Sequence, residues 1–347
     1  MLTAFCVLLS CTIANSQDIH FTLHQMTPLA FNPANTGGFY GTYRISGLYR
    51  DQYRSVTGAG AYTTPTFSVD LPIIKGFRDK DWVGVGLFFY NDKSGDAGLT
   101  QSAYKISAAY HLALNKKGST VLAVGYQTGA VGRRIKDQTK LVFEDELSIL
   151  NGMPNQSADL NLINVDKKGQ SFTDQVGGLK LTSKYNKTDE FSIGVALGKI
   201  GRPNWSLVKG GGGNYRLDPR LHVQAGMSML MSKTIRLSPV LSYQRIMKGS
   251  QSTFVAQAMV DYLYNEAKNV ILMGGLGYRS GQGFGDAIQI MAGAYIKDVK
   301  VLLGYDLNVS SLSVASLNQG GLELSAQYIG KVYKRPKPDP VIFCPRF

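Results

Sequence analysis

Residues 191–198 read Phe191-Ser192-Ile193-Gly194-Val195-Ala196-Leu197-Gly198, so large apolar side chains alternate with small ones. Successive side chains of a β-strand point to opposite faces, which places the four large residues on one face. The other face carries only Ser, Gly and Ala. One face suits lipid and the other suits a crowded or watery lumen, the pattern of a transmembrane β-strand.

The same alternation recurs along the chain, for example at 221–231 and 288–294. The first of these carries a stripe of Met227, Met229 and Met231, which we interpret as lipid-facing packing rather than a metal relay. An even strand number is the rule for bacterial single-chain barrels. We therefore predict an all-β fold, a transmembrane antiparallel up-and-down β-barrel of about 14 strands. The predicted strands are 40–51, 60–70, 82–90, 101–113, 119–131, 176–185, 190–199, 218–231, 233–247, 252–264, 269–280, 285–297, 299–310 and 320–333.

The connections between these strands alternate between short and long. Tight turns such as 115–118 and 186–189 alternate with long segments at 132–175 and 200–217. Outer-membrane barrels have short periplasmic turns and long extracellular loops. This rule places both chain ends of the barrel, 40–333, in the periplasm. The long extracellular loop 132–175 is expected to fold into the lumen, cap the barrel, hold a ligand or form a flexible surface loop.

The two ends of the chain have their own signals. Residues 1–16 have a short apolar core and small residues before Gln17, as in a secretory signal peptide. A lipoprotein signal with Cys11 as the acylated residue is the alternative. Residues 17–39 are expected to form a mostly extended periplasmic or lumenal segment, and 334–347 a proline-stiffened periplasmic tail. Only Cys344 then remains in the mature chain, so no internal disulfide forms.

The charge balance is basic, with 37 Lys and Arg against 24 Asp and Glu and a net charge of +13. These cations are scattered over turns and strand ends, which favours an anionic membrane surface or an acidic protein as partner over nucleic acid. The four histidines form no convincing cluster. His20 and His24 have metal-ligand spacing for a helix, but the nearby prolines favour extended structure. We predict no catalytic site, no metal site and no cofactor.

Both ends of the mature chain carry short motifs. The N-terminal ones are Gln17-Asp18, Phe21-Thr22, Pro28-Leu29, Asn32-Pro33-Ala34 and Thr36-Gly37, followed by Tyr49-Arg50-Asp51-Gln52-Tyr53-Arg54-Ser55. The C-terminal one is a basic stretch that ends in Cys344-Pro345-Arg346-Phe347. In these motifs the whole mature chain closely resembles the PorP/SprF family of Bacteroidetes type IX secretion membrane proteins. Two departures are His24, where Gln is usual, and Tyr53 in place of Trp.

The resemblance implies a non-enzymatic outer-membrane component of the type IX secretion and gliding motility system. It implies a role in binding, exporting or anchoring a secreted protein through that protein's C-terminal sorting domain. Implied partners are this cargo, periplasmic ring or peptidoglycan-linked components of the system, and outer-membrane lipid, with no nucleic acid. The predicted partner-binding residues are Lys334, Arg335, Lys337, Phe343, Cys344, Arg346 and Phe347 in the tail, with Asn32 and Pro33 near the N-terminus.

The alternative function is a passive, porin-like solute channel of the outer membrane. The small residues on the lumen face are compatible with an open pore. They are equally compatible with a lumen filled by the N-terminal segment or by the long loop. A porin conducts ions alone and a plugged anchor does not, so single-channel conductance separates the two.

Overall fold

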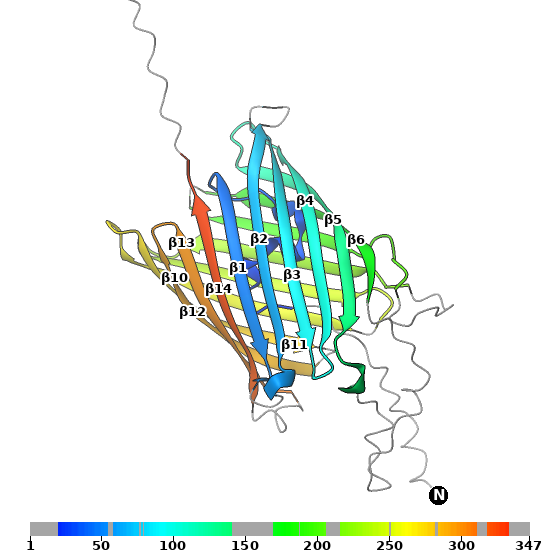
Figure 1. Cartoon of the computed structure of the whole chain (residues 1–347). Coiled ribbons are helices and arrows are strands. Elements are labelled where there is room, and N and C mark those ends of the chain that lie inside the picture. Colours follow the sequence, from blue (N-terminus) through cyan, green and yellow to red (C-terminus); the bar gives the residue numbers. More distant parts are fainter. Residues whose placement is uncertain are drawn as a thin grey trace, which may run out of the picture.

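The computed structural model describes residues 20–54, 58–75, 78, 80–140, 169–186, 188–205, 216–249, 251–281, 284–310 and 318–332. They form an antiparallel barrel with a segment inside it (Figure 1). The strands are β1 (Tyr43–Gln52), β2 (Tyr62–Lys75), β3 (Trp82–Ser94), β4 (Leu99–Ala113), β5 (Thr120–Ile135), β6 (Gln170–Lys184), β7 (Glu190–Gly198), β8 (Arg220–Leu230), β9 (Ile235–Ile246), β10 (Ser252–Asn265), β11 (Val270–Gly281), β12 (Phe284–Ile296), β13 (Val299–Asn308) and β14 (Gln319–Gly330). The short helical turns are η1 (His24–Met26), α1 (Pro28–Phe31), η2 (Pro33–Asn35), η3 (Gly58–Gly60) and η4 (Gln138–Lys140).

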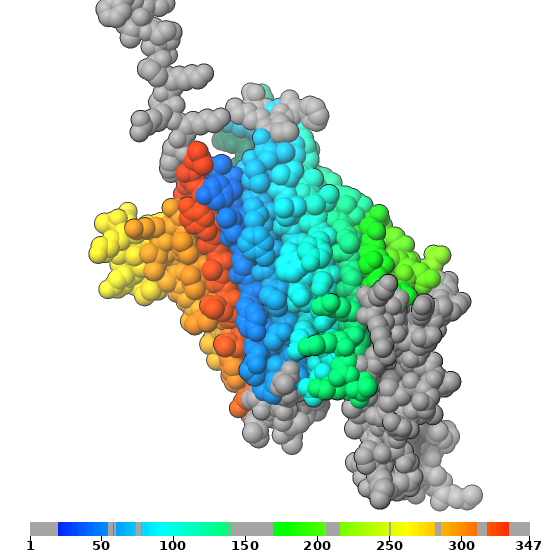
Figure 2. Space-filling view, in the orientation of Figure 1, coloured from blue at the N-terminus to red at the C-terminus, as the bar shows by residue number. Residues whose placement is uncertain are grey.

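The barrel is closed, because each strand pairs with its sequence neighbours and β1 also pairs with β14. In this last pairing Arg50 stands directly opposite Glu323. Figure 2 shows the red β14 beside the blue β1 on the outer wall. Closure removes free strand edges, which is what a sheet in lipid requires. The predicted fold class, including the number of strands, is confirmed.

The two faces of the wall follow the alternation seen in the sequence. Ile193 is 49% exposed on the outside, whereas its near neighbour Ala196 is buried in the lumen. Gln289 is buried between the outward-facing Ile288 and Ile290. Exposed tyrosines lie toward both rims of the wall, where membrane barrels carry aromatic girdles. They include Tyr185, Tyr264 and Tyr328 near one rim and Tyr49, Tyr62 and Tyr278 near the other.

The two rims differ in their connections. We call the rim where β1 begins and β14 ends the turn end; its connections are the short segments 76–81, 114–119, 185–189, 231–234, 266–269 and 297–298. We call the opposite rim the loop end; it holds the longer connections 136–169, 199–219 and 309–318. The predicted loop 132–175 is shorter than expected, since β5 runs to Ile135 and β6 begins at Gln170. Polar residues such as Arg133 and Asp174 face the lumen there. In the sequence alone, polar residues of this kind are typical of a loop, so the strand ends are not predicted.

Residues 20–39, which we call the plug, lie inside the lumen, where Figure 1 shows them in dark blue. Phe21, Leu23 and Met26 pack against wall residues that include Met291 and Leu302. The expectation of a mostly extended segment is wrong here, because η1, α1 and η2 are helical turns. Pro28 and Pro33 begin two of these turns, a position that needs no backbone N–H. No helix among the residues described is long and apolar enough to cross a membrane.

Candidate functional site

The first candidate site is the anchor that holds the plug toward the loop end. Glu323 on β14 accepts hydrogen bonds from the backbone N–H groups of Thr22 and Leu23, each at 2.8 Å. Arg50 on β1 contacts both Glu323 and Asp306, the latter at 3.0 Å. Both carboxylates are at most 1% exposed. Buried charges are stable only when they are paired and hydrogen-bonded, and here each partner is supplied by the plug or by another strand.

Side chains of three further strands complete this loop-end anchor. Gln257 on β10 donates to the Thr22 carbonyl at 2.9 Å and to Gln289 at 2.7 Å. Gln289 on β12 donates in turn to the Thr22 hydroxyl at 3.1 Å, and that hydroxyl donates to Asp306. Arg279 on β11 reaches Asp306 at 2.8 Å. Thr22 of the plug is therefore bonded to four strands, β10, β12, β13 and β14.

A second anchor fixes the plug at the turn end. Asp70 on β2 accepts the N–H of Gly37 at 2.7 Å and a two-pronged contact from Arg44 at 2.9 and 2.7 Å. Trp82 donates its indole N–H to the Gly37 carbonyl at 2.9 Å. The Trp82 ring stacks on His111, with centroids 4.4 Å apart, and His111 contacts the Thr36 carbonyl at 2.8 Å. The plug therefore runs from the loop-end half of the lumen to the turn end.

The middle of the plug fits the wall through small residues. Asn32 accepts the N–H of Ala34 at 2.9 Å and donates to the carbonyls of Leu179 and Val195 at 3.1 and 3.3 Å. A β-carbon at Gly178 would collide with the Asn32 side chain, and one at Gly125 would collide with the backbone at Pro33 and Ala34. Glycine at these two wall positions lets the plug backbone lie directly on the sheet.

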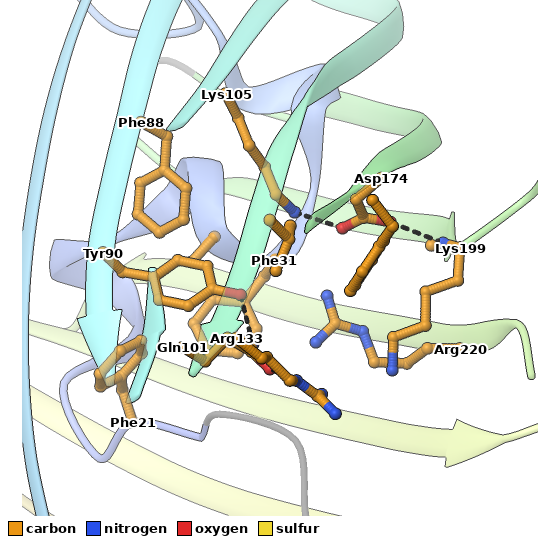
Figure 3. A pocket seen from close by; sticks show the side chains of 14 residues that line it. Phe21, Phe31, Phe88, Tyr90, Gln101, Lys105, Arg133, Asp174, Lys199 and Arg220 are labelled. Carbon is orange, nitrogen blue, oxygen red and sulfur yellow. Dashed lines mark hydrogen bonds and ion pairs between the residues drawn. The ribbon is translucent and has the colours of Figure 1, made fainter. Parts of the chain in front are cut away.

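Among the residues described, two cavities border the helical turns of the plug. The loop-end cavity is lined by aromatic rings that include Phe88 and Tyr90, and by cations that include Lys105, Arg133 and Arg220 (Figure 3). Asp174 is the carboxylate of its lining and pairs with Lys105 at 2.5 Å. The turn-end cavity has a volume of about 220 Å³. Its lining is polar and includes His24, Gln25, Asn32, Arg44, Lys180 and Gln224.

Of the predicted partner-binding residues, Asn32 and Pro33 are buried in the lumen against the wall. The seven tail residues, from Lys334 to Phe347, lie outside the described residues. Binding of a partner by any of the nine remains a prediction. Sequence reasoning missed Glu323, Asp306 and Asp70, although each is a carboxylate at a lumen-facing position of an otherwise regular strand. A carboxylate at such a position predicts a polar contact in the lumen, but the sequence does not show which residue it contacts.

Taken together, the closed wall and the buried plug define a plugged transmembrane β-barrel. The family model described as "Type IX secretion system membrane protein PorP/SprF" matches residues 13–328. The chain belongs to this family, and it is a multi-pass outer-membrane barrel of the type IX secretion system. The family resemblance and the outer-membrane localisation expected from the sequence are confirmed.

Several solved structures share the fold. The monoaromatic hydrocarbon channel CymD has a TM-score of 0.53 and 13% identity, over 89% of this chain and 94% of that one. The Ralstonia pickettii toluene transporter TbuX has a TM-score of 0.52 and 14% identity, over 88% and 94%. The P. putida toluene transporter TodX has a TM-score of 0.51 and 11% identity, over 88% and 93%. At such identity the likeness concerns the fold alone. Among curated proteins none matches the chain.

Proposed function

We propose that this barrel is a non-enzymatic anchor that binds the C-terminal sorting domain of a secreted protein, aids its export and holds it at the cell surface. Membership of a secretion-system family supports a role in secretion at the outer membrane. The observation that carries the proposal is the plug, which lies in the lumen and is fixed by buried charges at both ends. A lumen occupied in this way suits a rigid docking platform better than an open pore.

The strength of the two anchors supports a permanently seated plug. A hydrogen bond to a charged group contributes about 1.5–3 kcal/mol net, and a neutral one about 1 kcal/mol. Thr22, Leu23 and Gly37 each donate a backbone N–H to a buried carboxylate. Breaking several such contacts together is unfavourable, so we expect the plug to remain seated while the barrel binds its partners.

The two rims then offer separate surfaces. With the short turns in the periplasm, the loop end faces outward and is the place for a secreted sorting domain. The turn end faces the periplasm, where the tail 334–347 would dock on ring or peptidoglycan-linked components of the secretion and gliding machinery. The basic residues of the tail suit an acidic partner.

The second candidate function is a passive solute channel. The two cavities beside the plug favour it, and the channels and transporters with the same fold are compatible with it. A channel of this kind would conduct as a purified protein, without cargo. An anchor with a seated plug would show no porin-like conductance.

The test is to purify the tagged protein from outer membranes at native expression level and identify its companions by mass spectrometry. A tagged outer-membrane barrel of another family, purified in parallel, is the control for nonspecific capture. The proposal expects a secreted protein with a C-terminal sorting domain among the specific companions. Recovery of the barrel alone, together with a stable ionic conductance, would support the channel instead.

A further inference from the structure

The two cavities lie on opposite sides of one side chain. Phe31, the last residue of α1, lines both the loop-end and the turn-end cavity. Phe21 and Ala30 of the plug also line the loop-end cavity, together with wall residues such as Arg133 and Arg220 at loop-end strand ends. The turn-end lining includes Arg44 and Gly38, close to the opposite rim. The Phe31 ring thus borders two spaces, one toward each end of the plug.

The ring is held in place by three other rings. Phe21 and His24 of the plug meet it edge-on, with centroids 6.2 and 6.1 Å away. His222 of β8 lies on its other side at 5.2 Å, and the His222 imidazole is oriented by a 2.9 Å hydrogen bond to Ser242. Phe31 therefore spans from plug to wall, and its ring is an apolar surface between two imidazoles; apolar surfaces can close a pore by excluding water.

The turn-end cavity has the lining of a wet space. The Nε2 atoms of His24 and Gln25 are buried and find no hydrogen-bond partner among the residues that the structure describes. Buried polar atoms of this kind are normally satisfied by water. A volume of about 220 Å³ holds several water molecules. With water on the turn-end side, the apolar ring of Phe31 is the part of this contact that opposes the passage of water and ions.

Both cavities carry positive charge. Lys105, Arg133, Lys199 and Arg220 line the loop-end cavity, with Asp174 as its carboxylate. Lys180 lines the turn-end cavity together with Arg44, whose charge is paired with Asp70, and the lining itself contains no carboxylate among the residues described. Pores lined by Arg and Lys favour anions, as rings of such residues do in anion channels.

We propose that the two cavities are the halves of a pathway for small anions beside the plug, closed at Phe31. The pathway does not depend on the anchoring function, because it leaves the plug seated. It also differs from an open porin, since one aromatic ring keeps it shut.

The test is single-channel recording in planar bilayers, with a KCl gradient to read the ratio of chloride to potassium permeability. We expect the wild-type current to be small. Replacing the ring in Phe31→Ala should raise the current about tenfold or more, because each 1.36 kcal/mol removed from a barrier multiplies the rate by ten. The new current should favour chloride. Phe31→Ser, which also makes the constriction polar, is the second variant in case the first assembles poorly.

Leu29→Ala is the matched control. Leu29 lies on the same helical turn and is 1% exposed, but it packs with Phe88 and Tyr90 and lines neither cavity. We expect its current to stay at the wild-type level. An equal rise of the current in Leu29→Ala would mean that any loosening of the plug opens a conducting path. This result would overturn the proposal. An unchanged current in both Phe31 variants, or a current that favours potassium, overturns it as well.

The charge of the path is tested in the Phe31→Ala background. Lys180→Gln keeps the capacity to bond to Asn35, whose contact with Lys180 is 2.9 Å, and should lower the preference for chloride. Lys300→Gln removes a lumen charge outside both cavities and should leave the preference unchanged. Equal effects of the two variants would show that the overall lumen charge, and not this path, sets the selectivity.

Discussion

Arg50 on β1 and Glu323 on β14 form a buried ion pair across the seam where the first and last strands close the barrel. The same Glu323 carboxylate accepts the N–H groups of Thr22 and Leu23 from the plug. Closure of the barrel and seating of the plug are thus parts of a single charged network. A substitution that weakens the closure of the barrel is therefore expected to disturb the seating of the plug, and the reverse is expected as well.

Removing the Glu323 charge should unseat the loop-end part of the plug. Glu323→Gln keeps the shape but leaves Arg50 with a weakened partner, and breaking a buried pair costs about 3–5 kcal/mol. We expect amide exchange at Thr22 and Leu23 to accelerate roughly a hundredfold in hydrogen-exchange mass spectrometry. Glu190→Gln, at the turn-end start of β7, is the control and should exchange as the wild type does. Full protection of both amides in Glu323→Gln would contradict the role given to this carboxylate.

A single methyl group at Gly125 should displace the middle of the plug. A β-carbon there meets the backbone at Pro33 and Ala34, which cannot yield as a side chain can. Overpacking of this kind costs about 1–3 kcal/mol. Limited proteolysis should cut residues 28–37 faster in Gly125→Ala than in the wild type.

Gly132→Ala provides the matched control on the same strand, because a β-carbon at Gly132 has no neighbour within 4 Å. It should be cut at the wild-type rate. Equal cutting rates in Gly125→Ala and Gly132→Ala would show that the close fit of plug to wall is unimportant.

The turn-end anchor can be followed through Trp82, whose indole donates to Gly37. The chain has two tryptophans, so Trp205→Phe leaves Trp82 as the reporter. In that background Asp70→Asn weakens the contacts to Gly37 and Arg44 and should shift Trp82 emission to the red as water enters. Asp261→Asn changes a carboxylate on β10, far along the wall from β2, and should leave the Trp82 emission unshifted. Identical spectra for both variants would argue against Asp70 as an anchor.

Deleting 334–347 should leave the barrel assembled and heat-modifiable on gels but detach it from its periplasmic partners. The reason is that the network that closes the barrel is made by residues of β1 and β14, which the deletion leaves in place. Replacing Lys334, Arg335 and Lys337 by Glu should weaken the same association if charge steers it. Unchanged recovery of ring components with both variants would assign the docking to another surface.

The wall could be predicted from the sequence because its signal is local. Alternation such as Ile288-Gln289-Ile290 fixes which side chain faces lipid, and each of the fourteen strands overlaps a range that this patterning predicts. Errors gather where polar lumen-facing residues such as Arg133 extend a strand beyond its apolar part. There polarity alone cannot separate strand from loop.

The plug could be predicted only as a segment near or in the lumen. Its helical turns depend on contacts with the wall rather than on propensity, and the bond from Thr22 to Glu323 joins residues 301 positions apart. No spacing of residues in the sequence predicts such a pairing. The position of Phe31 beside both cavities could not be predicted for the same reason, because its ring neighbours come from the plug and from β8.

The most direct test of the central claim, that a seated plug closes this barrel, is the conductance of the purified full-length protein beside a variant that lacks residues 20–37. Both proteins must first be shown to be heat-modifiable barrels. We predict no porin-like openings in the wild type and large, stable openings in the deletion variant. Large openings of equal size in both proteins would contradict the account and make the barrel an open channel.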